Sequence, residues 1–461
     1  MDKLKIFKGK KFHFIGIGGI SMSALARFLK RDGFYVQGSD ETINAEVKKL
    51  IKSKIKVFLG HSKNNVLNAD VVIYSSAIHE DNPELKFARD NHLIVLKRAE
   101  LLGMIASGFK TVIAVAGSHG KTTTTAMISE IFISAGLKPT VHIGGELKSI
   151  NSNYKVGNKK FFITENCEYM DNFLFVKPDL SVILNIDSDH LDYFKTLSGV
   201  KKSFFKYALV TKENGLNIVF NEDKNSEDIA ALDNSISFGF DSGCDIFAKN
   251  IKEYKSGYFS FDAVFEKCNL GNIKLNIIGE HNVLNALASI LVGLICGIDF
   301  CDIKQSIENF SGVKRRCEKI CEQGGVRVYH DYAHHPVQIE KMIQTAKELV
   351  KNDNGKIVTI FEPHTFSRTK FLLSDFAKSF IGSDYVFLAP VYSAREDESV
   401  GLSSADLLAE TKKYNQNVFL FNSYAEIIKQ AKSVLKPNDL VLVLGAGNIE
   451  KLARNFFWTK Q

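Results

Sequence analysis

The chain has no run of eighteen apolar residues, and its first residues, Met1–Lys11, mix lysine with apolar side chains without an apolar core or a cleavage site. These absences argue against a membrane-spanning helix and a secretory signal, so we expect a cytoplasmic protein. Internal repeats, low-complexity tracts and heptad seams are also lacking. The sequence therefore predicts a globular protein rather than a fibrous, repetitive or membrane protein.

Cysteine is scarce and unpaired in the sequence. Seven cysteines occur, at positions 167, 244, 268, 296, 301, 317 and 321, and no two of them form a Cys-x-x-Cys pair. An odd number without such pairs indicates reduced thiols and provides no zinc-binding set.

The length, composition and net charge of the chain indicate the number of domains and the class of ligand. The 461 residues are enough for about three domains of the usual size. Hydrophobic residues make up 45% and charged residues 24% of the chain, which is ordinary for a globular protein. The net charge of +7 is spread along the chain, so nucleic acid binding is not indicated, whereas an anionic small substrate is compatible.

A candidate phosphate-binding loop follows the apolar run Val112–Ala116. Gly117 and Gly120 lead into Lys121 and Thr122, at the start of a periodic helix. Backbone N–H groups of such a loop bind phosphates, a lysine reaches the outer phosphates, and the next hydroxyl coordinates Mg²⁺. We therefore assign Lys121 to the phosphates and Thr122 to the metal; a glycine turn capped by threonines is the alternative.

A second glycine loop follows the strand predicted at Lys11–Ile15. Gly16 permits a tight turn, Gly18 lets backbone approach a pyrophosphate, and Asp40, beyond the next strand, could meet a ribose hydroxyl. Ser21 stands where a third glycine usually packs the helix on the strand. The pattern predicts a βαβ unit whose ligand could be NAD, FAD or a nucleotide sugar.

The rest of the N-terminal region continues this α/β pattern. Ser75 and Ser76 end the apolar part of Ala69–Ile78, where their hydroxyls could serve a ligand or simply form a turn. Arg98 begins a helix that leads toward Gly108. We place the first domain boundary at that glycine.

Two strands of the middle region end in residues that can bind metal. Glu165 follows the predicted strand 161–164, and His190 follows the predicted strand 180–186. Because the carboxyl ends of neighbouring parallel strands meet at one crevice, both side chains could stand near Thr122 and bind a divalent cation. An exposed strand end for Glu165 and a turn position for His190 are the alternatives.

Polar residues also begin a later apolar helix and follow the second boundary. His281, Asn282 and Asn285 lie on the first turns of that helix, where they could contact an adenine edge; helix capping is the ordinary alternative for Asn282. Arg315 and Arg316 could reach a phosphate, or could be surface arginines in a solvated joint.

Strands and helices alternate again after residue 312. The pattern predicts strands at Val326–His330, Lys356–Phe361, Asp384–Leu388, Val418–Phe421 and Asp439–Leu444, and helices at Pro336–Leu349, Ser367–Phe380, Ser404–Lys413 and Tyr424–Leu435. This alternation predicts a third, mostly parallel doubly wound domain. Polar clusters follow its strands and should line one edge of the sheet; they are His330–Pro336, Phe361–Thr369, Tyr392–Glu396 and Gly445–Asn448. The predicted fold class is therefore α/β, with a Rossmann-like N-terminal domain, a central P-loop ATPase-like domain and a Rossmann-like C-terminal domain. The predicted boundaries are 1–108, 109–312 and 313–461.

Five segments carry a more specific signal. They are Gly16-Ile-Gly-Gly-Ile-Ser-Met-Ser-Ala-Leu-Ala26, Ala116-Gly-Ser-His-Gly-Lys-Thr-Thr123, Asn185-Ile-Asp-Ser-Asp-His-Leu-Asp192, His281-Asn-Val-Leu-Asn285 and Asp331-Tyr-Ala-His-His-Pro336. In their order and spacing they resemble the Mur ligases of peptidoglycan synthesis. The resemblance covers nearly the whole chain and implies that the three domains bind a UDP-sugar, ATP and an amino acid, respectively.

The resemblance implies ATP-dependent amide synthesis with UDP-N-acetylmuramate and L-alanine as substrates and Mg²⁺ as the accompanying ion. The lactyl carboxylate of the sugar would attack the γ-phosphate of ATP, and the amine of alanine would then attack the resulting acyl phosphate. Domain closure would keep water from that intermediate. A ligase that adds a ready-made tripeptide fits the same motifs, and the N-terminal glycine loop alone would also fit an NAD-dependent oxidoreductase. A nucleic acid partner and membrane insertion are not implied, and a monomer or a homodimer is compatible.

The resemblance also gives roles to individual residues. For ATP they are Gly117, Ser118, His119, Gly120, Lys121, Thr122, Thr123, His281, Asn282, Asn285 and Arg316. For the γ-phosphate and metals they are Lys121, Thr122, Glu165 and His190, with Lys121, Glu165 and His190 as the catalytic set. For the UDP-sugar they are Gly16, Gly18, Gly19, Ser21, Asp40, Ser75, Ser76 and Arg98. For the amino acid they are His334, His335 and Arg368.

Four positions depart from the usual family pattern. Thr365 stands three residues before Arg368, where the family has a second arginine, which leaves open how the alanine carboxylate is held. His330 replaces the first of two aspartates. Ser118 for threonine and Glu362 for glutamine are compatible with the same function.

Overall fold

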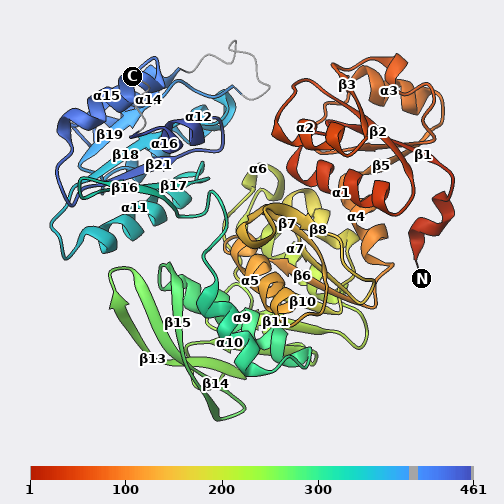
Figure 1. Ribbon diagram of the computed structural model, residues 1–461, viewed down its shortest axis with the longest axis horizontal. Helices are drawn as coiled ribbons and strands as arrows, with labels where there is room; N and C mark the ends of the chain where they lie inside the picture. The colour runs from red at the N-terminus through yellow and green to blue at the C-terminus, as the bar shows by residue number, and fades with distance from the viewer. Residues whose placement is uncertain (1, 394–402, 458–461) are drawn as a thin grey trace. The chain divides into compact units, whose positions relative to one another are not determined.

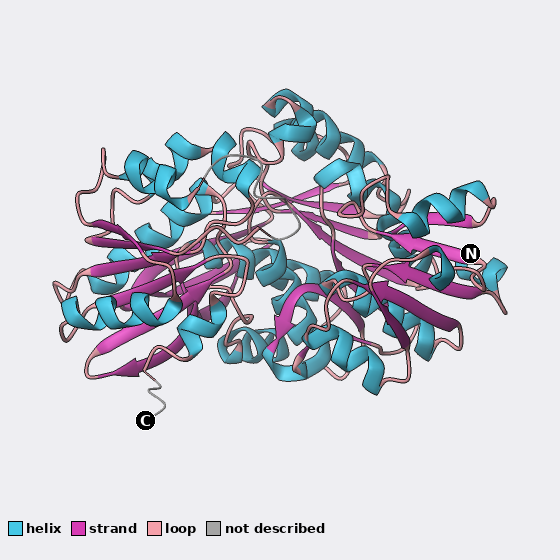
Figure 2. Ribbon diagram, turned by 90° about the horizontal axis from the view of Figure 1, so that it is seen from above, coloured by secondary structure: helices cyan, strands magenta, loops and turns pink. Residues whose placement is uncertain are grey.

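The computed structural model describes residues 2–393 and 403–457 and contains three β-sheets with helices packed on them (Figures 1 and 2). The chain divides into two compact units. The first consists of Met1–Ile251, Phe261–Leu275 and His281–Ser311, and the second of Lys252–Ser260, Asn276–Glu280 and Gly312–Gln461. Among the described residues, none of the helices has the length and apolar content needed to cross a bilayer.

The N-terminal sheet is parallel and has the strand order β3-β2-β1-β4-β5. Its strands are β1 (Lys11–Ile15), β2 (Tyr35–Asp40), β3 (Lys56–Leu59), β4 (Val71–Tyr74) and β5 (Ile94–Lys97). Its helices are η1 (Lys3–Phe7), α1 (Ile20–Arg31), α2 (Ala45–Lys52), η2 (Lys63–Asn65), α3 (Pro83–Asp90) and α4 (Arg98–Ala106). The strand order reverses at β1, so the loop after β1 lies where open parallel sheets bind ligands.

Helix α1 forms because its apolar residues recur at helical spacing and pack on the sheet. Met22, Leu25 and Leu29 are all buried in one core cluster with Phe12 of β1. The chain leaves the helix through Gly33, whose φ of 91° is unfavourable for other residues. The predicted βαβ unit is therefore present.

The central sheet has the strand order β15-β14-β13-β12-β11-β10-β6-β9-β7-β8. Its strands are β6 (Thr111–Ala116), β7 (Thr140–Leu147), β8 (Ser152–Lys155), β9 (Phe161–Glu165), β10 (Leu180–Ile183), β11 (Leu216–Phe220), β12 (Ser235–Gly239), β13 (Ile246–Lys255), β14 (Tyr258–Phe265) and β15 (Cys268–Ile278). Strand β6 pairs in parallel with β9 and with β10. The three carboxyl ends therefore open at one edge.

The helices of this region are α5 (Lys121–Ser134), η3 (Lys148–Ile150), η4 (Tyr169–Phe175), α6 (Leu191–Phe194), α7 (Leu197–Leu209), α8 (Glu227–Ala230), α9 (His281–Ile295) and α10 (Phe300–Asn309). Helices α5 and α9 pack against each other. Both are buried along most of their length, with Ile128 and Ile131 of α5 and Leu287 and Ile290 of α9 fully buried. This packing brings the first turn of α9 to the phosphate loop.

The C-terminal sheet has the strand order β16-β17-β21-β18-β19-β20. Its strands are β16 (Glu318–Gln323), β17 (Val326–Asp331), β18 (Ile357–Phe361), β19 (Tyr385–Leu388), β20 (Val418–Leu420) and β21 (Leu440–Leu444). Its helices are α11 (Pro336–Val350), α12 (Phe366–Phe371), α13 (Leu373–Ser379), α14 (Ser404–Thr411), α15 (Tyr424–Val434) and α16 (Glu450–Arg454). Only the edge strand β16 pairs antiparallel among these described strands.

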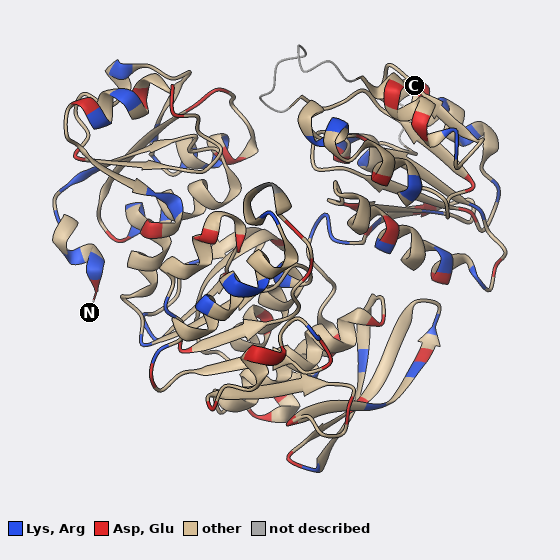
Figure 3. Ribbon diagram, turned by 180° about the vertical axis from the view of Figure 1, so that it is seen from behind, with Lys and Arg blue, Asp and Glu red and all other residues tan. Residues whose placement is uncertain are grey.

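These three sheets confirm the predicted α/β fold class. The helix predicted over 367–380 is divided at Leu372, where φ of −108° and ψ of 22° interrupt the helical backbone. The predicted edge cluster Tyr392–Glu396 lies partly outside the described residues. Figure 3 shows Lys and Arg interspersed with Asp and Glu over the helices.

Candidate active site

The loop between β6 and α5 requires two of its glycines. Gly117 has φ of 139° and Gly120 has φ of 84°, both in the range that favours glycine. A Cβ added at Gly120 would also lie 2.7 Å from Asn285 Oδ1. The loop thus passes α9 so closely that only backbone fits there.

The segment after β10 braces this loop. Asn185 accepts the backbone N–H of Ser118 at its carbonyl (3.0 Å) and that of His119 at its side chain (2.7 Å). Asp187 donates its N–H to Ser118 Oγ at 2.8 Å, and its carboxylate lies 3.1 Å from His119 Nε2. These contacts with Asn185 and Asp187 fix the conformation of the loop.

Lys121 points back over the loop. Its Nζ donates to the carbonyls of Gly117 and Ser118, the latter at 3.3 Å, and to Glu168 Oε1 at 3.0 Å. The side chains of Lys121 and Glu168 are 14% and 1% exposed, so this ion pair is largely buried. Burial works against the charged ammonium, but the carboxylates of Glu168 and Glu165 and the Cys167 thiol raise the pKa of Lys121, which keeps it protonated.

Thr122 and Glu165 meet beside the lysine. Thr122 Oγ1 donates to Glu165 Oε2 at 2.9 Å, and the N–H of Gly144 donates to the same oxygen at 2.8 Å. A Cβ at Gly144 would stand 2.5 Å from that oxygen, so glycine is needed for the approach. A hydroxyl and a carboxylate in contact are suitable oxygen ligands for Mg²⁺.

A second group of possible ligands lies next to the first. Among the described residues, Glu168, Asp189 and His190 each place one ligand atom within 4.8 Å of the others. Glu168 Oε2 is buried and makes no hydrogen bond, although it lies 3.0 Å from Lys121 Nζ. His190 has φ of 54°, which turns its ring toward Glu168, with 3.9 Å between Nε2 and Oε1. Carboxylates and an imidazole fit a divalent cation.

The sequence predicted Thr122, Glu165 and His190 as metal ligands and did not include Glu168, and the metal-binding role of all four stays a prediction. The structure pairs Thr122 with Glu165 and groups His190 with Glu168. The available signal was position, because Glu168 follows Glu165 by three residues after the same strand.

The α9 residues divide into two kinds. Asn282 and Asn285 are buried, and Asn285 donates to Asn282 Oδ1 at 2.8 Å while accepting from Thr124 Oγ1 at 3.1 Å. His281 is exposed at the first residue of the helix, and Thr123 is half-buried on α5. The asparagine pair therefore fixes α9 to the phosphate loop.

In the N-terminal glycine loop, Gly16 has φ of 73°, and Gly19 is the N-cap of α1. Gly18 donates its N–H to Asp40 Oδ2 at 2.8 Å, and Asp40 is 4% exposed. Asp40 thus shapes the loop. Ser75, directly after β4, is half-buried, and Ser76 is exposed at the start of the following turn; their role toward a ligand stays a prediction.

Arg98 lies close to this loop. Its Nη1 donates to Ser21 Oγ at 3.2 Å. Burial lowers the pKa of Arg98, which the thiol of Cys167 and the carboxylate of Glu165 partly offset. Arg98 therefore contacts the glycine loop through Ser21 and lies within range of the charge of Glu165, a residue of the same unit.

The predicted amino-acid residues lie in the second unit. His334 Nδ1 donates to the carbonyl of Tyr332 at 2.9 Å, since a carbonyl only accepts, so Nδ1 carries the proton. Burial first, and then the charge of Arg368, lower the pKa of His334 to about 3. The charge of Arg316 acts in the same direction, and its guanidinium lies 5.6 Å from the Tyr332 ring. His335 is the N-cap of α11.

Three further residues of that unit were not predicted as site residues. Asp331 accepts the N–H groups of Cys317 and Ala333, both at 2.7 Å, and so shapes the turn after β17. Glu362 bonds the hydroxyl of Tyr424, and burial raises the pKa of Glu362. Tyr424 begins α15, far along the chain from Glu362, so the sequence alone did not indicate that the two side chains meet.

Comparisons with known proteins agree with an architecture of three sheet-containing α/β domains. Three family models match: the Mur ligase family, catalytic domain, at residues 11–110; the Mur ligase middle domain, at 115–293; and the Mur ligase, glutamate ligase domain, at 315–447. The chain belongs to the Mur ligase family, which confirms the resemblance found in its motifs.

Individual relatives are similar over almost the full length. A UDP-N-acetylmuramate–L-alanine ligase of Clostridium tetani is 44% identical, covering 96% of this chain and 96% of the relative. One of Caldanaerobacter subterraneus is 41% identical, covering 98% of each. The crystal structure of UDP-N-acetylmuramate-alanine ligase from Thermotoga maritima matches with a TM-score of 0.81 and 30% identity, covering 97% of this chain and 98% of that one. A murein peptide ligase of Psychrobacter arcticus, at 22% identity and a TM-score of 0.73, shares the fold.

Proposed function

We propose that this chain is an ATP-dependent ligase that forms an amide bond between the carboxyl group of UDP-N-acetylmuramate and the amino group of L-alanine. The observation that carries the proposal is 44% identity, over 96% of both chains, to the Clostridium tetani ligase of that name. The reaction would convert ATP to ADP and phosphate and supply the first amino acid of the peptidoglycan stem peptide.

The phosphate loop would hold ATP for the first step. Lys121 would exchange its loop carbonyls for the outer phosphates, while Gly117–Gly120 would offer backbone N–H groups to them. Thr122 and Glu165 would hold one Mg²⁺, and His190 with Glu168 and Asp189 fits a second cation. Bound Mg²⁺ would neutralise the charge that builds up on the transferring phosphoryl group.

The two substrate carboxylates would be held elsewhere. The loop Gly16–Ser21 with Arg98 would place the sugar acid so that its carboxylate attacks the γ-phosphate and releases ADP. In the second unit, Arg368 would pair with the carboxylate of alanine. Because Nδ1 of His334 carries its proton, Nε2 offers a lone pair to the ammonium of alanine. The free amine, after loss of a proton, would attack the acyl phosphate and release phosphate.

The test is phosphate release with ATP, UDP-N-acetylmuramate and one amino donor at a time: alanine, serine, glycine, or a tripeptide. We expect turnover with alanine that requires the sugar and far exceeds turnover with the tripeptide. Preference for the tripeptide would identify a recycling ligase instead. Binding of NAD(P) without any sugar-dependent ATP hydrolysis would support an oxidoreductase. Cytoplasmic location and the oligomeric state stay predictions.

A further inference from the structure

A continuous chain of hydrogen bonds joins the N-terminal glycine loop to the strand that carries Glu165. Ser21 Oγ lies 2.9 Å from His142 Nε2, and His142 Nδ1 lies 3.1 Å from Thr164 Oγ1. Thr164 Oγ1 in turn donates to the carbonyl of Glu165 at 3.1 Å. All four residues belong to the same compact unit.

The direction of each bond follows from the chemistry of its partners. A carbonyl oxygen only accepts, so the single hydroxyl hydrogen of Thr164 points to Glu165. Thr164 Oγ1 therefore accepts from His142, which places the proton of the neutral ring on Nδ1. His142 Nε2 is then an acceptor, and the hydroxyl hydrogen of Ser21 points to it. The order of donation is Ser21, His142, Thr164, Glu165.

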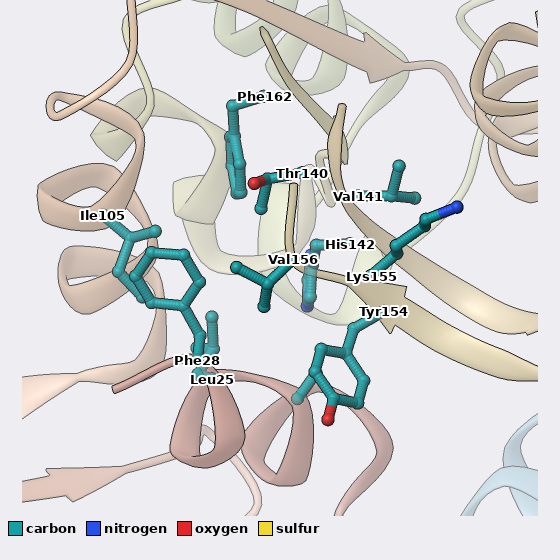
Figure 4. Close-up of a pocket in the computed structure, with 11 residues that line it drawn as sticks. Leu25, Phe28, Ile105, Thr140, Val141, His142, Tyr154, Lys155, Val156 and Phe162 are labelled. Atoms are coloured by element: carbon teal, nitrogen blue, oxygen red, sulfur yellow. The ribbon is translucent and has the colours of Figure 1, made fainter. Parts of the chain in front are cut away.

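The surroundings of His142 keep the ring neutral. It is 6% exposed and lines a small cavity with apolar side chains that include Leu25, Phe28 and Val156 (Figure 4). Burial, and then the charge of Arg98, lower the pKa of His142 to about 3. The ring therefore stays neutral near pH 7, and its hydrogen-bond partners determine which nitrogen carries the proton.

This order determines what Ser21 can do. Its hydrogen is used by His142, so toward any other group Ser21 Oγ is an acceptor, and it accepts Nη1–H of Arg98 at 3.2 Å. Among the described residues this is the one side-chain hydrogen bond that Arg98 makes, whereas a guanidinium has five N–H donors. Arg98 is thus oriented by Ser21 and keeps donors for an anion.

We propose that His142 is a positioning residue for the nucleotide-sugar substrate: it fixes the Ser21 hydroxyl so that Ser21 holds Arg98 in place to bind an anionic group of that substrate. The inference rests on the proposed function, which supplies the anion. His142 itself touches no substrate, and it acts through Ser21 and Arg98.

The test compares two substitutions that each retain one side of the ring. In His142→Gln the amide reaches the position of Nε2 and can accept from Ser21, whereas in His142→Asn it reaches only the position of Nδ1 and can donate to Thr164. Binding of UDP-N-acetylmuramate without ATP is measured by calorimetry, KM for the sugar and for ATP by phosphate release, and folding by thermal unfolding.

We expect His142→Asn to weaken sugar binding by about tenfold, the effect of one lost hydrogen bond in a buried site, with KM for ATP unchanged. His142→Gln should stay within about threefold of the wild type. Equal sugar affinities for the two variants, or equal rises in both KM values, would overturn the proposal and indicate a merely structural histidine.

The same titration separates this result from a failure of the proposed function. If the wild type neither binds UDP-N-acetylmuramate nor turns over with it, the proposed function fails before any variant is compared. If His142→Asn unfolds the protein, Thr164→Val removes the hydrogen bond between Thr164 and His142 while leaving His142 in place. A normal sugar affinity in Thr164→Val would also contradict the proposal.

Discussion

Removal of Lys121 should affect stability and catalysis through two separable causes. Lys121→Ala leaves Glu168, which is 1% exposed, without its counter-charge, and its oxygen Oε2 already makes no hydrogen bond. Breaking a buried ion pair from one side costs about 3–5 kcal/mol. Because the lysine side chain is itself 14% exposed, we expect the lower end of that range, about 3 kcal/mol.

The double variant Lys121→Ala/Glu168→Gln tests this cause. It removes the stranded carboxylate, so its free energy of unfolding should exceed that of Lys121→Ala by at least about 1 kcal/mol. Lys10→Ala is the matched control, because the Lys10–Asp70 pair is 48% and 36% exposed and should contribute no more than about 1 kcal/mol. The measurement is urea unfolding followed by circular dichroism.

The double variant should regain stability but not catalytic activity. Loss of the ammonium should raise the barrier to turnover by at least about 3 kcal/mol in both Lys121→Ala and the double variant. The reasoning is refuted if the double variant is no more stable than Lys121→Ala, or if Lys121→Ala destabilises the protein no more than Lys10→Ala does. Near-normal turnover by either variant would overturn the phosphate assignment.

Three other outcomes are expected. His190→Ala should raise the Mg²⁺ concentration needed for half-maximal turnover, and an unchanged Mg²⁺ titration would count against His190 as a ligand. Glu362→Gln should stabilise the protein near pH 7. Burial raises the pKa of Glu362, so the wild type loses stability as pH rises through that pKa. A difference in free energy of unfolding between the two proteins that does not change with pH would contradict this. Glu84→Gln should destabilise the protein by about 2 kcal/mol, because the buried carboxylate accepts hydrogen bonds from Ser39 and Asn65 and pairs with His13. Burial favours a raised pKa for Glu84, but His13 and His61 outweigh it and lower that pKa, and Glu84 in turn raises the pKa of His61. The difference in free energy of unfolding between the wild type and Glu84→Gln should therefore shrink as pH falls below 4.5 and again as pH rises above 6.5. A difference that does not change with pH would argue against this network.

The sequence was informative about the fold where local patterns determine it. The strand Lys11–Ile15 was predicted with the bounds that the structure has, since its apolar run ends at a glycine with φ of 73°. Strand β16 was missed because Glu318–Gln323 is mostly polar and lies at a sheet edge, where only its pairing with β17 makes it a strand. The break at Leu372 within the predicted helix 367–380 could not be predicted, because no glycine or proline occurs there to indicate the end of a helix.

The candidate site divides in the same way. Lys121 and Thr122 could be predicted because glycines mark their loop, and Glu165 because it ends a recognisable strand. The grouping of His190 with Glu168 could not, because it depends on left-handed backbone at residues that are not glycine: His190 has φ of 54°, and Met170, after Glu168, also has φ of 54°. Such residues are uncommon, and the structure around them must compensate for the backbone strain. Strain held at these two turns, beside the buried carboxylate that pairs with the phosphate-loop lysine, is itself a reason to place function there.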